Sequence, residues 1–96
     1  MPKKGIDQES RSLFIRNLVK LNNTQEVDNF LKDLFSSSEI IDFSRRIMAA
    51  KYLFEGKTYE EINSLMGMSP TTINKIKFKT KGSRILTKLI YNEKDN

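Results

Sequence analysis

The chain has 96 residues, no cysteine, no histidine and a formal net charge of +5. Its length supports one domain, and the missing cysteines and histidines exclude a disulfide scaffold and a zinc site built on them. No apolar run reaches the roughly 18 residues of a membrane span, and the first ten residues lack the apolar core of a signal peptide. We therefore expect a cytoplasmic protein without a membrane partner, and a short chain without staples is a candidate for oligomerisation.

The N-terminal third predicts a basic arm and two helices. Residues 1–6 form a short basic arm that we expect to be disordered, and a single helical domain is predicted over 7–92. Apolar residues share one face between about 7 and 21, where the first helix is predicted. A second helix begins at Thr24, its expected N-cap, and has the clearest amphipathic spacing of the chain. The apolar residues of that helix are Val27, Phe30, Leu31, Leu34 and Phe35.

The third predicted helix is the longest and is apolar on more than one side. Ser36 and Glu39 form a capping box at its start, and Gly56 is placed to end it. A helix that is apolar most of the way round is buried on most sides. In so short a chain, a second copy is the simplest partner to cover it, which predicts a homodimer. One stripe contains Ile40, Phe43, Ile47, Ala50 and Phe54, and the other contains Ile41, Met48 and Tyr52.

Residues 58–79 predict two short helices joined by a tight turn. Thr58 and Glu61 form a capping box at the start of the first helix. Gly67 ends that helix, because glycine tolerates the left-handed conformation of a helix stop. The spacing is typical of a helix-turn-helix, whose second helix enters the DNA major groove. An ordinary helical hairpin is the alternative interpretation.

The second helix of this pair begins at Ser69, a predicted N-cap, with Pro70 at its first position. Ile73 and Ile76 face inward, so the polar residues around them face outward. Between Ser69 and Lys88 the chain carries basic residues and no acidic one. A solvated face is the ordinary explanation of such a stretch, but this one starts inside the second helix, which is the footprint expected for a polyanion.

Individual roles follow from side-chain chemistry if the second helix lies in the major groove. The amide of Asn74 matches the N7 acceptor and the N6 donor of adenine, and Thr71 and Thr72 offer hydroxyl and methyl groups to base edges. Lys75 is placed to reach either guanine or a phosphate. The other basic side chains of this stretch position the protein by meeting phosphates. Tyr59 either contacts a phosphate or packs at the start of its helix. Phe78 is either a core residue below the last helix, which is the favoured interpretation, or an exposed wedge. The candidate DNA-binding residues are Thr58, Tyr59, Ser69, Thr71, Thr72, Asn74, Lys75, Lys77, Lys79, Lys81 and Arg84.

A last amphipathic helix is predicted after a break at Gly82, and residues 93–96 are expected to fray. No strand pattern interrupts this order, so the sequence predicts an all-α fold. No enzyme is expected, because there is no histidine for acid–base chemistry, no cysteine nucleophile and no glycine-rich phosphate loop. The apolar residues of the last helix are Ile85, Leu86, Leu89 and Ile90.

Two segments of the chain carry a family resemblance, namely SRRIMAAKYLFEGKTYEEINSLMG and MSPTTINKIK. Over residues 35–79 the chain resembles the Trp repressor superfamily, and especially its Trp repressor-like (YerC/YecD) branch. The resemblance implies a Trp repressor-like helical domain and an interlocked homodimer. It also implies two recognition helices presented to a two-fold symmetric DNA site.

The same resemblance locates a candidate ligand pocket. Trp repressor holds tryptophan between two basic side chains, and their counterparts by resemblance are Arg46 and Lys75. Lysine keeps the charge but lacks the planar fork of arginine. The glycine that follows in Trp repressor is Ile76 here, and its branched side chain fills space that the indole needs. We therefore expect no tryptophan co-repressor and no other cofactor; an anion is the better match for the pocket, and an ion pair is the alternative use of Arg46.

The sequence thus predicts a sequence-specific transcriptional regulator that binds double-stranded DNA and a second copy of itself. The DNA-binding subunit of a mobile-element protein is one alternative. A helical interaction or RNA-binding module, whose basic stretch meets an acidic partner, is another. Competition among duplexes separates these, because an adaptor shows no preference between DNA sequences.

Overall fold

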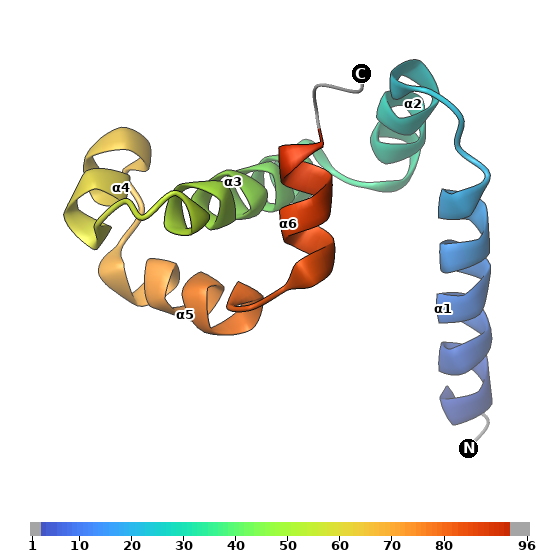
Figure 1. The fold of residues 1–96 in the computed structure, drawn as a ribbon. Coiled ribbons are helices and arrows are strands. Elements are labelled where there is room, and N and C mark those ends of the chain that lie inside the picture. The colour runs from blue at the N-terminus through green and yellow to red at the C-terminus, as the bar shows by residue number, and fades with distance from the viewer. Residues whose placement is uncertain (1–2, 93–96) are drawn as a thin grey trace. The chain divides into compact units, whose positions relative to one another are not determined.

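The computed structural model describes residues 3–92, and this part of the chain contains α-helices and no strand (Figure 1). The prediction of an all-α fold is confirmed. No helix within the described range is long and apolar enough to cross a membrane. The helices are α1 (Lys3–Val19), α2 (Thr24–Leu34), α3 (Ser37–Phe54), α4 (Tyr59–Met66), α5 (Pro70–Thr80) and α6 (Arg84–Tyr91).

The start of the chain differs from the sequence prediction. Helix α1 begins at Lys3, so residues 3–6, assigned above to a disordered arm, are helical. A single glycine, here Gly5, costs only about 1 kcal/mol in a helix and does not stop one that continues for several turns. Residues 1–2 of the predicted arm and the predicted frayed tail at 93–96 lie outside the described residues.

The chain divides into two compact units, residues 1–37 and 38–96. In the first unit, Asn23 rather than Thr24 caps α2, because its side chain accepts the backbone N–H of Glu26 at 2.9 Å. The ring of Phe14 in α1 stacks on Phe30 of α2, with ring centres 6.1 Å apart. These contacts join α1 to α2, but no residue of α2 is fully buried.

The second unit has its core where α3, α4 and α5 meet (Figure 1). Helix α3 contributes two alanines, which bring the backbones close, and α4 and α5 contribute branched side chains. Tyr59 and Met66 are half-buried against this core. The fully buried apolar residues are Ala49, Ala50, Ile62, Met68, Ile73 and Ile76. Only one member of the predicted α3 stripes, Ala50, belongs to this group, so most of the apolar surface of α3 lies outside the core.

Helix α6 completes the second unit but contributes little to its core. Ser83 caps α6 by accepting the backbone N–H of Leu86, as expected for a helix that starts after the break at Gly82. No residue of α6 is fully buried, and Ile85 and Leu89 are exposed. The apolar stripe that the sequence predicts on this helix is therefore present, but only Leu86 and Ile90 are half-buried within the single chain.

Candidate nucleic-acid interface

The turn between α4 and α5 is built by side chains that the sequence predicts for it. Thr58 and Glu61 form a complete capping box at the start of α4. The backbone N–H of Thr58, followed by its hydroxyl, holds the pKa of the Glu61 carboxyl below its usual value. Gly67 ends α4 with φ of 67°, in the left-handed region that glycine adopts without strain. The amide of Asn63 then donates to the carbonyl oxygen of Met68 at 2.8 Å, which ties α4 to the turn that precedes α5.

The inner side of α5 is fixed by burial, and this fixes its outer side. Ile73, Ile76 and Thr80 are buried, and the Thr80 hydroxyl donates to the Ile76 carbonyl oxygen at 2.7 Å. The opposite side of a helix is then set by its 3.6-residue period. That outer face consists of Thr71, Asn74, Lys75 and Phe78, which are all exposed and follow the spacing i, i+3, i+4, i+7.

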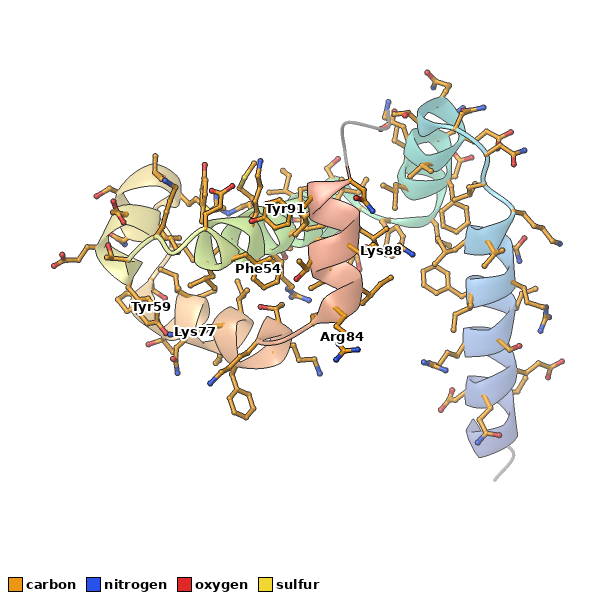
Figure 2. All side chains as sticks on the ribbon, in the orientation of Figure 1. Phe54, Tyr59, Lys77, Arg84, Lys88 and Tyr91 are labelled. Atoms are coloured by element: carbon orange, nitrogen blue, oxygen red, sulfur yellow. The ribbon has the colours of Figure 1, made fainter. Side chains whose placement is uncertain are left out.

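A contact from α4 holds one residue of this outer face. The hydroxyl of Tyr59 donates to the Oδ1 atom of Asn74 at 2.9 Å. The ammonium of Lys77 lies over the Tyr59 ring, 5.6 Å from its centre (Figure 2). Since Oδ1 already accepts one hydrogen bond, the amide is oriented and its Nδ2 donors are left on the exposed side. Tyr59 also packs against the core, as the packing alternative for this residue predicts.

Phe78 contradicts the sequence prediction. It was expected in the core below the last helix, but 86% of its surface is exposed. The physical reason is its register on α5, since Phe78 lies four residues after the exposed Asn74 and two after the buried Ile76. The inward side of the helix is already occupied by the buried stripe, so this phenylalanine faces outward.

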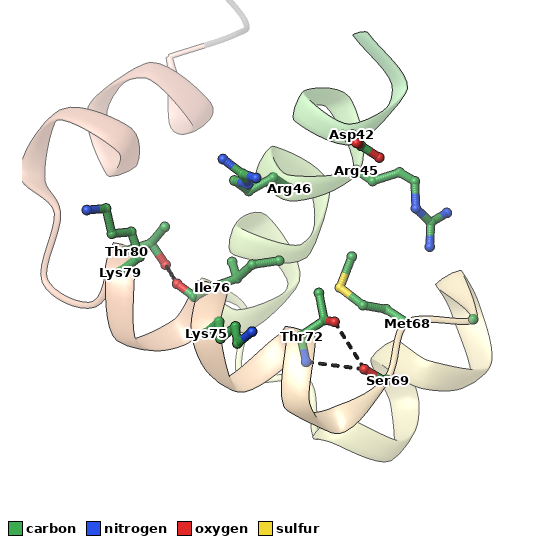
Figure 3. Close-up of a pocket in the computed structure, with 11 residues that line it drawn as sticks. Asp42, Arg45, Arg46, Met68, Ser69, Thr72, Lys75, Ile76, Lys79 and Thr80 are labelled. Atoms are coloured by element: carbon green, nitrogen blue, oxygen red, sulfur yellow. Dashed lines mark hydrogen bonds between the residues drawn. The ribbon is translucent and has the colours of Figure 1, made fainter. Parts of the chain in front are cut away.

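The hydroxyl residues at the start of α5 have a capping role. Ser69 accepts the backbone N–H of Thr72 at 3.2 Å and donates to its Oγ1 at 3.0 Å (Figure 3). Both residues line the pocket between α3 and α5, and neither belongs to the stripe that forms the outer face. Of the hydroxyl residues predicted to reach bases, Thr71 is therefore the one on the outer face.

Basic side chains lie on both sides of the outer face of α5. Lys77 lies on the α4 side, over Tyr59, whereas Lys79 lines the pocket on the α3 side. Lys81 and Arg84 follow at the turn into α6 and are exposed, and Figure 2 shows Arg84 near the start of that helix. The outer face of α5, with its polar and aromatic side chains, is thus flanked by cations on both sides, as the basic stretch of the sequence indicates.

A pocket of about 740 Å³ lies between α3 and α5 (Figure 3). Arg46 and Lys75, the two residues paired by resemblance, both line it, and so does Ile76. The guanidinium of Arg46 lies 5.5 Å from the centre of the Phe43 ring. Arg45 donates to the carbonyl oxygen of Met66, which links α3 to the end of α4. No group of residues within 3–92 is arranged to hold a metal ion.

Sequence comparisons relate the chain to known proteins. The family profile described as Trp repressor protein matches residues 9–90. The chain belongs to the Trp repressor family. It is 33% identical over 74 residues to the uncharacterized protein YerC of Bacillus subtilis (strain 168), a match that covers 77% of this chain and 66% of that relative. No solved structure is significantly similar to the chain.

The two matches place the chain in the YerC-like branch of the Trp repressor family. Sequence reasoning located the capped pair α4–α5 and the two basic residues of the pocket. It missed the bond from Tyr59 to Asn74, because the two residues are 15 positions apart and no spacing rule joins them. The exposure of Phe78 could have been predicted from the sequence, since Phe78 lies four residues after Asn74 and therefore on the same helix face.

Proposed function

We propose that the protein is a homodimeric, sequence-specific transcriptional regulator in which α4 and α5 form a helix-turn-helix. Helix α5 enters the major groove in each half of a two-fold symmetric site. The observation that carries this proposal is the outer face of α5, where base-reading chemistry is exposed between two flanks of cations while the inner face is buried. Such a protein acts where its DNA is, in the cytoplasm.

The dimensions and chemistry of α5 suit this docking. A helix with its side chains is about 10–12 Å across, and the major groove is about 12 Å wide. Thr71 and Asn74 are then directed at base edges, with the Nδ2 donors of Asn74 available for an acceptor such as adenine N7. Lys77 and Lys79, on opposite flanks, are placed to meet phosphates on the two sides of the groove. Lys81 and Arg84 extend these phosphate contacts, whereas Thr58 and Ser69 support the docking mainly through the caps they form.

The homodimer is proposed from apolar surface that the single chain does not cover. Helix α3 exposes Ile41, Phe43, Ile47 and Met48, and α6 exposes residues from its own apolar stripe. Exposed apolar residues gathered on adjacent turns of two helices mark an interaction site. A second copy is the proposed partner, with α1, α2, α3 and α6 in the interface. Sedimentation equilibrium at micromolar concentration checks this, and a monomer with full helicity contradicts it.

Selection of bound duplexes from a random pool tests the function. We expect a recurring site with two-fold symmetry and a half-site spacing of about 34–36 Å or a multiple of it. A recurring site without symmetry favours the DNA-binding subunit of a mobile-element protein. No preference among duplexes, with binding to RNA or to an acidic protein instead, favours the interaction module and overturns the proposal.

We propose further that the pocket between α3 and α5 takes an anion and not tryptophan. Arg46 and Lys75 supply positive charge from two helices, and Ile76 occupies part of the space between them. Calorimetry with millimolar L-tryptophan should show no binding. Clear binding that also tightens the affinity for DNA overturns this proposal, and because DNA binding is measured separately, the DNA-binding proposal is unaffected.

A further inference from the structure

Phe78 is the largest apolar side chain on the outer face of α5, and nothing in the described chain covers it. Its exposed fraction is 86%, whereas the other large apolar residues of the helix, Ile73 and Ile76, are buried. Removing the ring from water against a partner is favourable. The question is therefore which partner covers the ring.

The surroundings of Phe78 favour an anionic partner. Lys77 and Lys79 are its neighbours in sequence, Lys75 lies one turn before it, and no acidic residue occurs between Ser69 and Lys88. A second copy of the chain docked symmetrically on this face would bring these lysines against their own counterparts, which is unfavourable. A polyanion is attracted to the same face.

Duplex DNA presents one apolar group on the floor of the major groove, the 5-methyl group of thymine. Phe78 lies seven residues after Thr71 on the same face, or about 10.5 Å along the helix axis. Because the groove runs obliquely to the duplex axis, this length spans at most about three base pairs at a rise of 3.4 Å. The two residues therefore face the same groove while addressing different base pairs.

We propose that Phe78 is a specificity-determining residue that reads a thymine by contact with its 5-methyl group. This rests on the proposed function, since it places α5 in the major groove. Thr71 and Asn74 supply hydrogen bonds to base edges, and Phe78 adds an apolar contact near the C-terminal end of the helix. The half-site thus has a thymine within about three base pairs of the base that Thr71 meets.

The test uses the duplex selected from the random pool. Each thymine is replaced in turn by deoxyuridine, which removes the methyl group and leaves every hydrogen-bonding group in place. We expect one thymine in each half-site at which the replacement weakens binding of the wild type about fourfold, as expected for one methyl group returned to water. Phe78→Ala should bind the thymine and deoxyuridine duplexes equally, whereas Phe78→Leu should keep part of the preference.

Two controls make the outcome specific. Leu65→Ala removes another exposed apolar side chain, on α4, and should leave the preference for thymine unchanged. Circular dichroism and sedimentation should show that Phe78→Ala is folded and dimeric, because the side chain it removes is exposed. If Phe78→Ala keeps the full preference at every thymine, the proposal is overturned.

Other results overturn it in distinguishable ways. If Phe78→Ala lowers affinity equally for both duplexes at every position, the ring is a wedge or a general contact and not a thymine reader. If the variant becomes monomeric, the ring belongs to the subunit interface. If the pool selection yields no preferred duplex, the proposed function itself fails and the role of Phe78 fails with it.

Discussion

The α4–α5 pair and the outer surfaces of α3 and α6 differ in how much of their apolar surface is buried within the chain. In the pair, both helices are capped by their own flanking residues, Thr58 and Ser69, and the branched residues Ile62 and Ile73 are fully buried. In α3 and α6, large apolar residues such as Ile47 and Leu89 remain exposed. The pair thus buries a core of branched residues within one chain, whereas α3 and α6 leave much of their apolar surface exposed.

This difference matches the proposed roles of the two regions, DNA binding for α4–α5 and dimerisation for α3 and α6. A reading helix must hold its side chains in fixed directions before it meets DNA, and α5 achieves this with a buried stripe on one side and the Tyr59 hydroxyl on Asn74. In the proposed homodimer, a second copy covers the exposed apolar surfaces of α3 and α6 and also supplies the second DNA-binding helix. Folding of the outer helices and formation of the two-fold DNA-binding unit are therefore expected to be one event.

The largest expected effect is on stability and comes from placing a charge on the exposed apolar surface of α3. Ile47 is 47% exposed in the single chain, so Ile47→Asp would cost little if the protein were a monomer. If a second subunit buries this position, an unpaired charge there costs on the order of 3–5 kcal/mol and should unfold the protein. Urea denaturation followed by circular dichroism, at several protein concentrations, measures the difference.

Leu65→Asp is the matched control for that variant. Leu65 is 58% exposed and also lies in a helix, but α4 is outside the proposed interface. Its replacement should cost at most about 1 kcal/mol, mostly from helix propensity. Equal stability of the two variants at all protein concentrations would show that Ile47 is not buried by a partner.

A smaller effect, on DNA affinity, is expected from changing the outer face of α5. Asn74→Ala should cost about 1–3 kcal/mol on the preferred duplex and flatten the preference at one base pair in each half-site. Its effect on random DNA should be small, because phosphate contacts carry that affinity. Binding across all single-base variants of the selected site is the measurement, and an equal loss on every duplex would make Asn74 a positioning residue.

Tyr59→Phe separates the orientation of Asn74 from its presence. The variant keeps the ring that packs on the core and beneath Lys77, and removes only the hydroxyl that donates to Oδ1. We expect the preference at the Asn74 base pair to weaken by about 0.5–1.5 kcal/mol, the usual net value of one hydrogen bond. In the background of Asn74→Ala the same change should have no effect on that preference.

Features of the fold and site that depend on close neighbours in the sequence could be predicted. The caps at Thr58 and Ser69, the stop at Gly67 and the buried Ile73 and Ile76 depend on neighbours within a few positions, and all are confirmed. The cap of α2 shifted by one residue because Asn23 and Thr24 are both competent caps.

Contacts between distant parts of the chain are harder to predict. The bond from Tyr59 to Asn74 depends on the angle between two helices, which no local pattern encodes. The burial of Phe78 was predicted wrongly because an apolar residue was assumed to be inside, although its position on the helix directs it outward.

The smallest expected effect concerns the phosphate contacts around the outer face of α5. If each dimer neutralises on the order of 6–10 phosphates, the logarithm of the affinity should fall with the logarithm of the salt concentration with a slope of about −5 to −9. Lys79→Ala removes one proposed contact from each subunit, so the slope should become shallower by about two and all duplexes should weaken equally. Lys32→Ala is the control, because Lys32 lies in α2 and pairs with Asp28 at 2.8 Å. An unchanged slope for Lys79→Ala, or the same change for both variants, would place the phosphate-binding surface elsewhere on the protein.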